Sequence, residues 1–256
     1  MNEVFKYGNE QTTTYLWKLF SRVFQSEHFP ETWSQGLIFP LFKGGPISAR
    51  TDVGKYRGIT LLSIIGKIYT DFLNQRVSLW MEKECILSDE QAGFRRARST
   101  VDQLFILTET IKCNRPQKTY CAFIDIAKAY DRVWRDGLWH KLWEAGVKGK
   151  MWRILKNIYK QVKSSVMLGK YRTDFFLIEV GLRQGCLLSP ILFDLFIDDL
   201  VKEINALGKG VQCGQKKLSI LLFADDIVLL ANSPEDLQLM LDTIYSFSLR
   251  YRFKFN

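Results

Sequence analysis

The stretch LSILLFADDIVLLA at residues 218–231 places two adjacent aspartates, Asp225 and Asp226, between two strongly apolar runs. Such runs are typical of strands, but their connection lacks the Asn-Gly or Asp-Gly pair that favours a tight hairpin turn. Two neighbouring carboxylates beside apolar walls repel each other, and a bound cation would offset that repulsion. A solvent-exposed polar turn also explains the pair, so this stretch alone does not distinguish a metal site from a surface turn.

A second stretch, TYCAFIDIAKAYDRVW at residues 119–134, supplies a third carboxylate. An apolar strand delivers Asp125 at its end, and a lysine-bearing turn follows. Hard oxygen ligands from separate strands suit Mg²⁺ better than zinc, and the five cysteines and two histidines form no CxxC pair or cluster. Two Mg²⁺ ions about 4 Å apart could activate a 3′-hydroxyl and stabilise a leaving pyrophosphate. The carboxylates therefore point to metal-dependent nucleotidyl transfer.

The composition indicates a globular chain with a polyanionic partner. Its 256 residues are 47% hydrophobic and 25% charged, enough for a core in one large domain or two joined lobes. Thirty-six Lys and Arg against 27 Asp and Glu give a net charge of +9, which favours nucleic acid or an acidic membrane surface. No run approaches the roughly 20 apolar residues of a membrane span, and the start lacks the order of a signal peptide. We therefore expect a soluble, intracellular protein without a membrane partner.

Apolar periodicity predicts an α+β fold, with helices packed on an antiparallel sheet. The expected helices span 63–84, 99–112, 189–206 and a segment from Pro234 to about Leu249. The expected strands span 119–126, 163–169, 173–180, 218–223 and 227–231. Ser99 with Asp102, and Ser233 with Pro234, suit the starts of two of the helices. The basic stretches at 43–57 and 95–98 are expected in loops, where a cation can reach a ligand.

Several segments together resemble reverse transcriptases of the non-LTR retrotransposon branch. AFIDIAKAYDRVW resembles their first catalytic motif, and FADD resembles their aspartate-pair motif. Between them, GLRQGCLLSPILFDLFIDDL resembles the motif that supports the template and the incoming nucleotide. Upstream, KYRGITLLSIIGKIYT and DEQAGFRRARSTVDQL resemble the fingers motifs of the same branch. The matching segments keep the family order from about Gly36 to Asn256, which makes chance agreement very improbable.

This resemblance implies the fingers and palm of a right-hand polymerase. Fingers are expected at 1–118 and a palm at 119–256, with an interleaved return to the fingers at about 133–182 and no thumb. The implied activity is RNA-directed DNA synthesis, in which dNTPs are added to a DNA primer on an RNA template. Two Mg²⁺ ions are the implied cofactors, and Mn²⁺ is the alternative ion.

The resemblance also assigns the metal ligands. Asp125 and Asp225 would ligate both ions, and Asp226 would complete or orient the coordination. The backbone carbonyl of Ile126 would add one more oxygen.

Nucleotide-binding roles follow from the same motifs. Arg57 and Lys43 resemble fingers cations that hold a triphosphate, although an exposed loop charge explains Lys43 equally well. Tyr130 resembles the aromatic gate that excludes a 2′-hydroxyl, and an ordinary packed tyrosine is the competing interpretation. Gln184 resembles the glutamine near the templating base, in a loop where the adjacent Gly185 permits close approach of the backbone.

Basic residues are expected to contact the template and primer. Arg95, Arg96 and Arg98 would face template phosphates, with a solvated basic loop as the alternative. The resemblance also assigns Arg183 and Gly185, on either side of Gln184, to contacts with the template and primer.

Two departures from the family pattern bear on activity. Gly58 stands where the usual motif has proline after the arginine. The sequence given ends at Asn256, before the lysine that could protonate pyrophosphate and before a thumb, so we expect binding of metal and nucleic acid but feeble polymerisation. A strand starting near Tyr251 would then expose Phe253 and Phe255.

Three alternatives to an active reverse transcriptase stay open at this stage. The chain could be an inactive remnant that only binds nucleic acid, or an unrelated basic scaffold. It could also be a maturase-like reverse transcriptase of a mobile intron, although AKAYDRVW favours the non-LTR branch.

Overall fold

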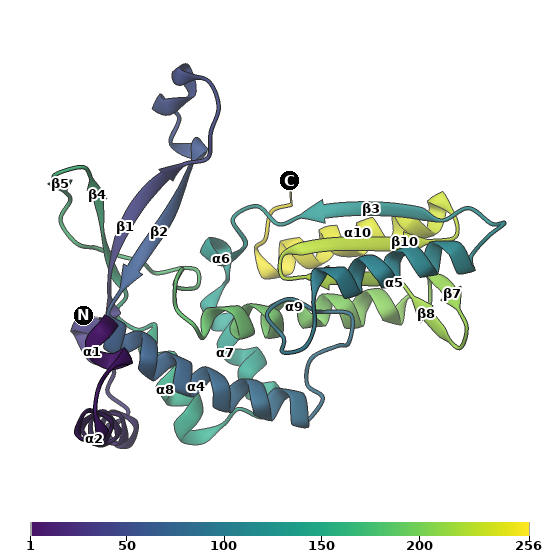
Figure 1. Cartoon of the computed structure of the whole chain (residues 1–256). Helices are drawn as coiled ribbons and strands as arrows, with labels where there is room; N and C mark the ends of the chain where they lie inside the picture. Colours follow the sequence, from purple (N-terminus) through teal and green to yellow (C-terminus); the bar gives the residue numbers. More distant parts are fainter. Residues whose placement is uncertain (1, 256) are drawn as a thin grey trace. The chain divides into compact units, whose positions relative to one another are not determined.

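A computed structural model describes residues 2–255, which form two compact units (Figure 1). Unit 1 comprises the residues up to 73 together with 142–179 and 183–187. Unit 2 comprises residues 74–141, 180–182 and those from 188 onward. The names fingers and palm, and the expected boundary near residue 118, stay predictions. Within residues 2–255, no helix is both long and apolar enough to cross a membrane.

Unit 1 combines short and medium helices with a mixed sheet. Its helices are α1 (Asn2–Lys6), α2 (Glu10–Ser26), α3 (Glu31–Ser34), the 3₁₀ turns η1 (Ile47–Thr51) and η2 (Val53–Lys55), and α8 (Gly149–Ile158). Its strands are β1 (Gln35–Phe42), β2 (Tyr56–Leu62), β4 (Lys163–Leu168), β5 (Tyr171–Arg172) and β6 (Phe176–Leu177). Two helices, α4 (Ile64–Lys83) and α7 (Arg135–Glu144), run from one unit into the other.

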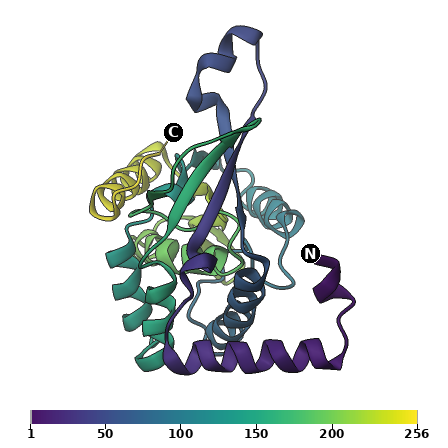
Figure 2. The same ribbon diagram turned by 90° about the vertical axis from the view of Figure 1, so that its left-hand side faces the viewer.

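Strands β1 and β2 form a long antiparallel ribbon, with η1 and η2 between them (Figure 2). The sheet order is β2-β1-β4-β5, with β6 also paired to β4, and the β1–β4 pair is parallel. We did not predict β1 and β2 from the sequence, because Gly36 and Pro40 interrupt an otherwise strand-like run. Gly36 is needed where it lies, since a Cβ there would approach Thr60 Cγ2 to 2.7 Å.

An aromatic cluster forms the core of unit 1. Tyr69 of α4 is fully buried, and its ring lies 5.9 Å from that of Trp33. Phe20 and Phe29 lie 5.4 and 6.2 Å from the same ring, measured between centroids. These contacts join α2, α3 and α4 at the base of the ribbon.

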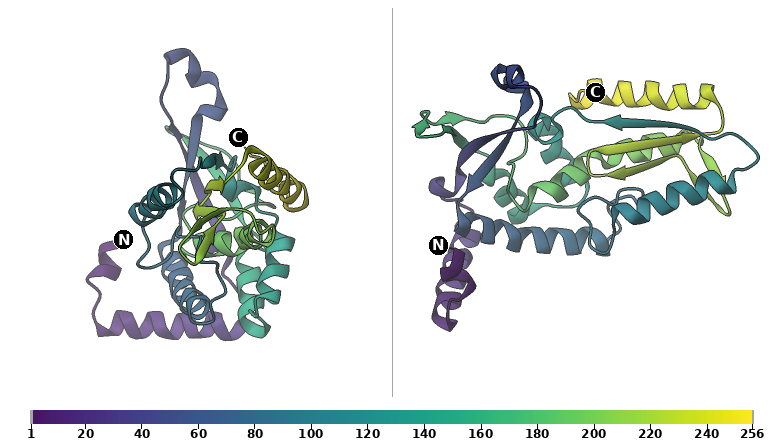
Figure 3. Two further views of the ribbon diagram at one scale, coloured as in Figure 1. Left: turned by 90° about the vertical axis from the view of Figure 1, so that its right-hand side faces the viewer. Right: turned by 45° about the horizontal axis from the view of Figure 1, so that its top comes forward.

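Unit 2 is built on the antiparallel sheet that we predicted. Its strands are β3 (Tyr120–Asp125), β9 (Ile220–Phe223) and β10 (Asp226–Ala231), in the order β3-β10-β9, with a separate hairpin of β7 (Val211–Cys213) and β8 (Lys216–Leu218). Its helices are α5 (Thr100–Cys113), α6 (Ala129–Arg132), α9 (Ser189–Ala206) and α10 (Pro234–Tyr251). In Figure 3, α10 lies along the strands, and it contacts both β3 and β10.

The expected helices are confirmed to within about two residues at each end. The start signals act as predicted, because Ser99 and Asp102 form a complete capping box and Ser233 accepts from the backbone of Asp236. The run at 173–180 was wrongly expected to be one strand. Only β6, two residues long, forms within it, since β5 precedes the run, and nearly all of its side chains are exposed because its pairing with β4 is short.

Two further expectations are corrected. Arg57 lies in β2 rather than in a loop. Tyr251 ends α10 rather than starting a strand, and Arg252 turns the chain back with a left-handed backbone (φ 61°). Phe255 is half-buried and bridges Ile126. Phe253 is buried rather than exposed, and its ring packs against Phe193, Phe196 and Phe247.

A carboxyl group lies buried on α9 without a hydrogen-bond partner in residues 2–255. Asp194 is fully buried, and neither of its carboxyl oxygens is hydrogen-bonded. Burial raises the pKa of Asp194 well above its ordinary value, and the nearby Asp198 and Glu82 add to that effect while Arg95 opposes it. The native state therefore keeps a proton that the unfolded chain loses.

We predict that Asp194→Asn stabilises the protein increasingly as the pH rises. At pH values where the folded state keeps the proton of Asp194 and the unfolded chain has lost it, the free energy of unfolding of the parent chain falls by about 1.4 kcal/mol per pH unit. Asparagine does not titrate, so the variant does not lose this stability. The difference in Tm between variant and parent should be smallest near pH 4 and reach several degrees by pH 8. Thermal denaturation at pH 4, 6 and 8 measures it. Asp174→Asn, in an exposed loop, is the control, and a Tm difference independent of pH would contradict the prediction.

Candidate nucleotidyl-transfer site

The adjacent aspartates lie where β9 returns into β10. Asp226 is the first residue of β10 and pairs with Phe223, the last residue of β9. Ala224 and Asp225 make the turn, and Ala224 has a left-handed backbone (φ 59°) that only glycine adopts without strain. The turn therefore exists in a conformation that its own residues do not favour.

The third aspartate lies directly across the sheet. Asp125 is the last residue of β3, and in the antiparallel register it is opposite Asp226. Residues opposite each other across a pair of strands project to the same face of the sheet, with Cβ atoms about 4.5–5.5 Å apart. Like charges in such positions repel, so both exposed carboxylates are placed to share a cation.

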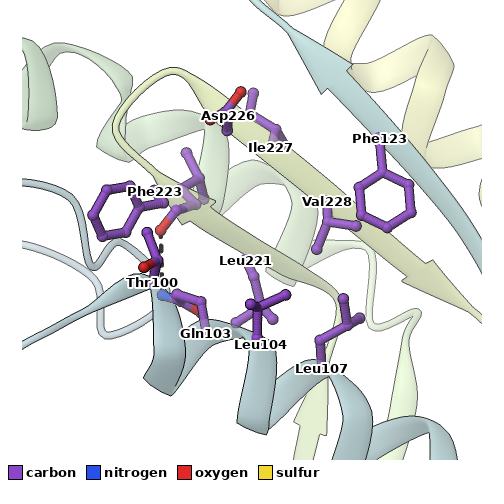
Figure 4. A pocket seen from close by; sticks show the side chains of 11 residues that line it. Thr100, Gln103, Leu104, Leu107, Phe123, Leu221, Phe223, Asp226, Ile227 and Val228 are labelled. Carbon is purple, nitrogen blue, oxygen red and sulfur yellow. Dashed lines mark hydrogen bonds between the residues drawn. The ribbon is translucent and has the colours of Figure 1, made fainter.

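The two faces of this sheet differ. The residues that alternate with the aspartates, including Ile227, Leu229 and Leu222, are almost fully buried on the face that α9 and α10 cover. The aspartate face instead carries Phe123, which is 75% exposed. A groove of about 250 Å³ lies on this face, between the sheet and α5, and Asp226 stands at its rim (Figure 4). Its walls are mostly apolar, so the carboxylates border a surface that binds water poorly.

A glutamine clamps the aspartate turn. The fully buried Gln91 donates its Nε2 to the carbonyl of Ala224 (3.2 Å), and its Oε1 accepts from the backbone nitrogens of Ala224 (3.0 Å) and Gly93 (2.8 Å). Gly93 lies so close that a Cβ there would come within 2.1 Å of the Ala224 nitrogen. Sequence reasoning gave Gln91 no role, although the pattern QAGF, with small residues beside a polar one, is a signal of close backbone approach.

Two more residues of the first motif lie in unit 2. Ile126 is buried, and the neighbouring Ala127 donates its backbone N–H to Lys254. The ring of Tyr130 stacks on Phe193, with centroids 5.3 Å apart and planes 17° apart. Tyr130 is only half-buried, so its ring is both packed and accessible.

The three predicted template arginines differ in exposure. Arg95 is buried and donates to both carboxylate oxygens of Glu82 (2.7 and 2.8 Å), and this hydrogen bonding lowers the pKa of Glu82. Its remaining donor reaches the carbonyls of Ser88 and Gln91. Arg98 is bound to Asp89, whereas Arg96 is exposed. The guanidinium of Arg95 is thus bound in the interior of unit 2, and contact of the three arginines with template phosphates stays a prediction.

The remaining predicted residues belong to unit 1. Lys43 is exposed beside the ribbon, and Arg57 is exposed on β2 opposite Leu41. Gln184 is half-buried, and Gly185 adopts a left-handed backbone (φ 84°) against the carbonyl of Thr60.

Arg183 is buried rather than exposed to a ligand. It donates to the carbonyl of Trp33 at 2.6 Å and lies over the ring of Phe29. Burial lowers the pKa of Arg183. Its guanidinium helps to hold α3 within unit 1, and its contact with template or primer stays a prediction.

The carboxylates do not by themselves form a complete set of metal ligands. Within residues 2–255, no three His, Cys, Asp or Glu side chains are gathered closely enough to hold an ion. The facing pair Asp125 and Asp226, with Asp225 next in the chain, nevertheless offers only hard oxygen donors at one edge of the sheet. This donor set fits a hard divalent cation whose other ligands come from water or substrate.

Comparison with known proteins shows which family the chain resembles. The family described as "Reverse transcriptase (RNA-dependent DNA polymerase)" matches residues 43–256. The chain is 30% identical over 250 residues to the probable RNA-directed DNA polymerase from transposon BS of Drosophila melanogaster, covering 94% of this chain and 27% of that protein. It is 26% identical to a Pol polyprotein from the type-1 retrotransposable element R2 of Popillia japonica, covering 86% of this chain and 30% of that protein.

Solved structures show the same fold. The apo telomerase of Candida tropicalis, truncated from its C-terminal domain, superposes with a TM-score of 0.63 at 16% identity. The match covers 88% of this chain and 49% of that chain. The chain thus spans well under half the length of the retrotransposon proteins that it matches. From the matched residues and the facing aspartates at the expected positions, we conclude that the chain belongs to the reverse transcriptase family.

Proposed function

We propose that this chain carries the polymerase site of a non-LTR retrotransposon, which extends a DNA primer with dNTPs on an RNA template. The observation that carries the proposal is the pairing of Asp125 with Asp226 across β3 and β10, next to Asp225. An unrelated basic scaffold is excluded by the family match, and the relatives named above favour a retrotransposon over a mobile intron.

Reverse transcriptases generally require a divalent metal cation. In this chain Asp125 and Asp225 would hold two Mg²⁺ ions, with Asp226 and the carbonyl of Ile126 completing the set, and Mn²⁺ as the alternative ion. When bound, the ions lower the pKa of the attacking hydroxyl and neutralise the departing pyrophosphate. The aspartates would position the primer end, and the apolar groove beside Asp226 would limit the access of water.

The remaining residues would bind and select the substrates. Arg57 and Lys43 would hold the triphosphate, and Gln184 with Gly185 would face the templating base. Arg96 is exposed and would contact template phosphates, with Arg98 beside it. Tyr130 would select deoxyribose, because the stacking on Phe193 fixes its ring while the side chain is only half-buried.

We predict that Asp225→Asn abolishes nucleotide incorporation and weakens Mn²⁺ binding, while RNA binding in EDTA stays within about twofold of the parent chain. The amide keeps the shape of the side chain but lacks the charge that a divalent ion requires. Single-nucleotide primer extension and an EPR titration with Mn²⁺ measure the two effects. Asp242→Asn, at an exposed position on α10, is the matched control. Incorporation at the parent rate by Asp225→Asn would refute the assignment.

We predict that Gln91→Leu lowers incorporation by about 100-fold without loss of RNA binding, because a misplaced turn moves Asp225 by a fraction of an ångström to an ångström. Leucine has a similar volume but makes none of the three hydrogen bonds to the turn and Gly93. Gln103→Leu is the control, because Gln103 also donates to backbone carbonyls in unit 2 but does not reach the turn. Equal losses in both variants would show that Gln91 has no special role.

We predict that Tyr130→Val raises the ratio of ribonucleotide to deoxyribonucleotide incorporation by about 10- to 100-fold, since the ring would no longer fill the space of a 2′-hydroxyl. Tyr130→Phe keeps the ring and its stacking on Phe193 and should leave the ratio unchanged. Competitive incorporation of GTP and dGTP measures the ratio. An active Tyr130→Val variant with the parent ratio would make Tyr130 a packing residue only.

A further inference from the structure

The positive charge of the chain is concentrated in one short segment of unit 1. Residues 142–163 hold six Lys and Arg against a single acid, Glu144, and so contribute five of the nine net positive charges. Two of these cations are neutralised, because Arg153 binds both oxygens of Glu27 (2.7 Å each) and Lys163 binds Glu31 (2.6 Å). The other four, Lys148, Lys150, Lys156 and Lys160, are all exposed.

Two tryptophans lie among these exposed lysines. Trp143, near the end of α7, is 47% exposed and meets the half-buried Trp152 of α8 edge to face, with centroids 5.8 Å apart. Lys148 lies 5.6 Å from the centre of the Trp143 ring, and Lys156 lies 4.8 Å from that of Trp152. We call Trp143, Lys148, Trp152, Lys156 and Lys160 the tryptophan–lysine patch. Lys150 is not a member, because it lies over the ring of Phe24 instead, 5.7 Å from its centre.

Helix geometry explains why the patch faces outward. Ile154, Leu155 and Ile158 are buried and hold one side of α8 against the core of unit 1. Trp152 and Lys156 are four residues apart, so they lie about 6 Å apart along the axis on another side of α8. Lys160 follows in the turn after the helix, which ends at Ile158 (Figure 2).

The chemistry of the patch fits single-stranded RNA. Exposed lysines attract phosphates, and the flat faces of tryptophans stack with unpaired bases. An acidic protein would need the charges but not the rings, and a duplex would hide its bases from them. Lys148 and Lys156 already lie near the rings, so a base stacked on a ring and its phosphate could be bound together.

We propose that the tryptophan–lysine patch is a second nucleic-acid surface, which binds single-stranded RNA independently of the metal-dependent site. The patch lies in unit 1, whereas the aspartates lie in unit 2. It uses stacking by Trp143 and Trp152, with phosphate contacts from Lys148, Lys156 and Lys160.

The test measures binding of a fluorescein-labelled, unstructured 20-nucleotide RNA by anisotropy. The full chain is used in EDTA, without primer or nucleotide, so that metal-dependent binding does not contribute. Trp143→Ala/Trp152→Ala should weaken RNA binding by about tenfold or more, but binding of heparin by no more than about twofold, because heparin has charges and no bases.

Charge variants separate the patch from the general charge of the protein. Lys156→Gln/Lys160→Gln should reduce the slope of log Kd against log salt by about 1.4, close to 0.7 for each phosphate that is no longer neutralised. The control, Lys216→Gln/Lys217→Gln, removes the same charge from exposed positions on β8, and it should change RNA binding by no more than about twofold.

Four results with the variants and the vesicles would overturn the proposal. The tryptophan variant could bind RNA like the parent chain, or it could lose RNA and heparin binding equally. The control could match the patch variant. Vesicles of phosphatidylcholine with one quarter phosphatidylserine could bind in a tryptophan-dependent way while RNA does not, which would make the patch a membrane surface. A crosslinking experiment uses only the parent chain, so it does not require any variant to fold. After irradiation with 4-thiouridine RNA, peptides from residues 142–163 should carry crosslinks. Absence of crosslinks in these peptides would also refute the proposal.

Discussion

Two carboxylates held face to face at the end of β3 and β10 set the conditions for the rest of unit 2. Their repulsion favours separation, so the backbone must be held from elsewhere. Gln91 and Gly93 hold it on one side, where hydrogen bonds and close approach keep Ala224 in a left-handed conformation. The apolar face behind the strands is fully packed on α9 and α10, which resists movement of the sheet. A cation can therefore be attracted by charges that are already in position.

Local signals predicted much of unit 2. Ser99 and Ser233 cap their helices as expected, because capping depends on residues within one turn. The strands around Asp125 and Asp226 were likewise evident from their own apolar runs. Unit 1 was harder to predict, since β1 contains Gly36 and Pro40, and its strand character comes from pairing with β2 and β4. Conversely, the apolar run at 173–180 finds only short pairing with β4, so its composition did not produce a long strand.

The candidate site shows the same limit. Residue type identified the aspartates, because two adjacent carboxylates between apolar strands repel each other unless a cation neutralises them. Type could not separate structural arginines from exposed ones. Arg95 belongs to the same motif as Arg96, and Arg183 belongs to the same motif as Gln184. In the interior of the structure, however, Arg95 is bound by Glu82 and Arg183 by the carbonyl of Trp33. Those partners are 13 and 150 residues away, respectively, so only the fold reveals them. Gln91 was missed for a related reason, since its partner Ala224 is 133 residues away.

The acidic residues of the candidate site and the exposed basic residues would contribute differently to the binding of a polyanion. Asp125, Asp225 and Asp226 repel phosphate, so the residues that perform chemistry cannot supply the affinity for nucleic acid. Affinity must come from exposed cations, and several candidates are already engaged, since Arg95, Arg153 and Lys163 are paired with carboxylates. Two groups of exposed cations lie near Arg57 on the β1–β2 ribbon and on α8. In the proposed function, binding and chemistry would therefore be carried by different residues, so that a substitution among the aspartates would leave the affinity for nucleic acid intact.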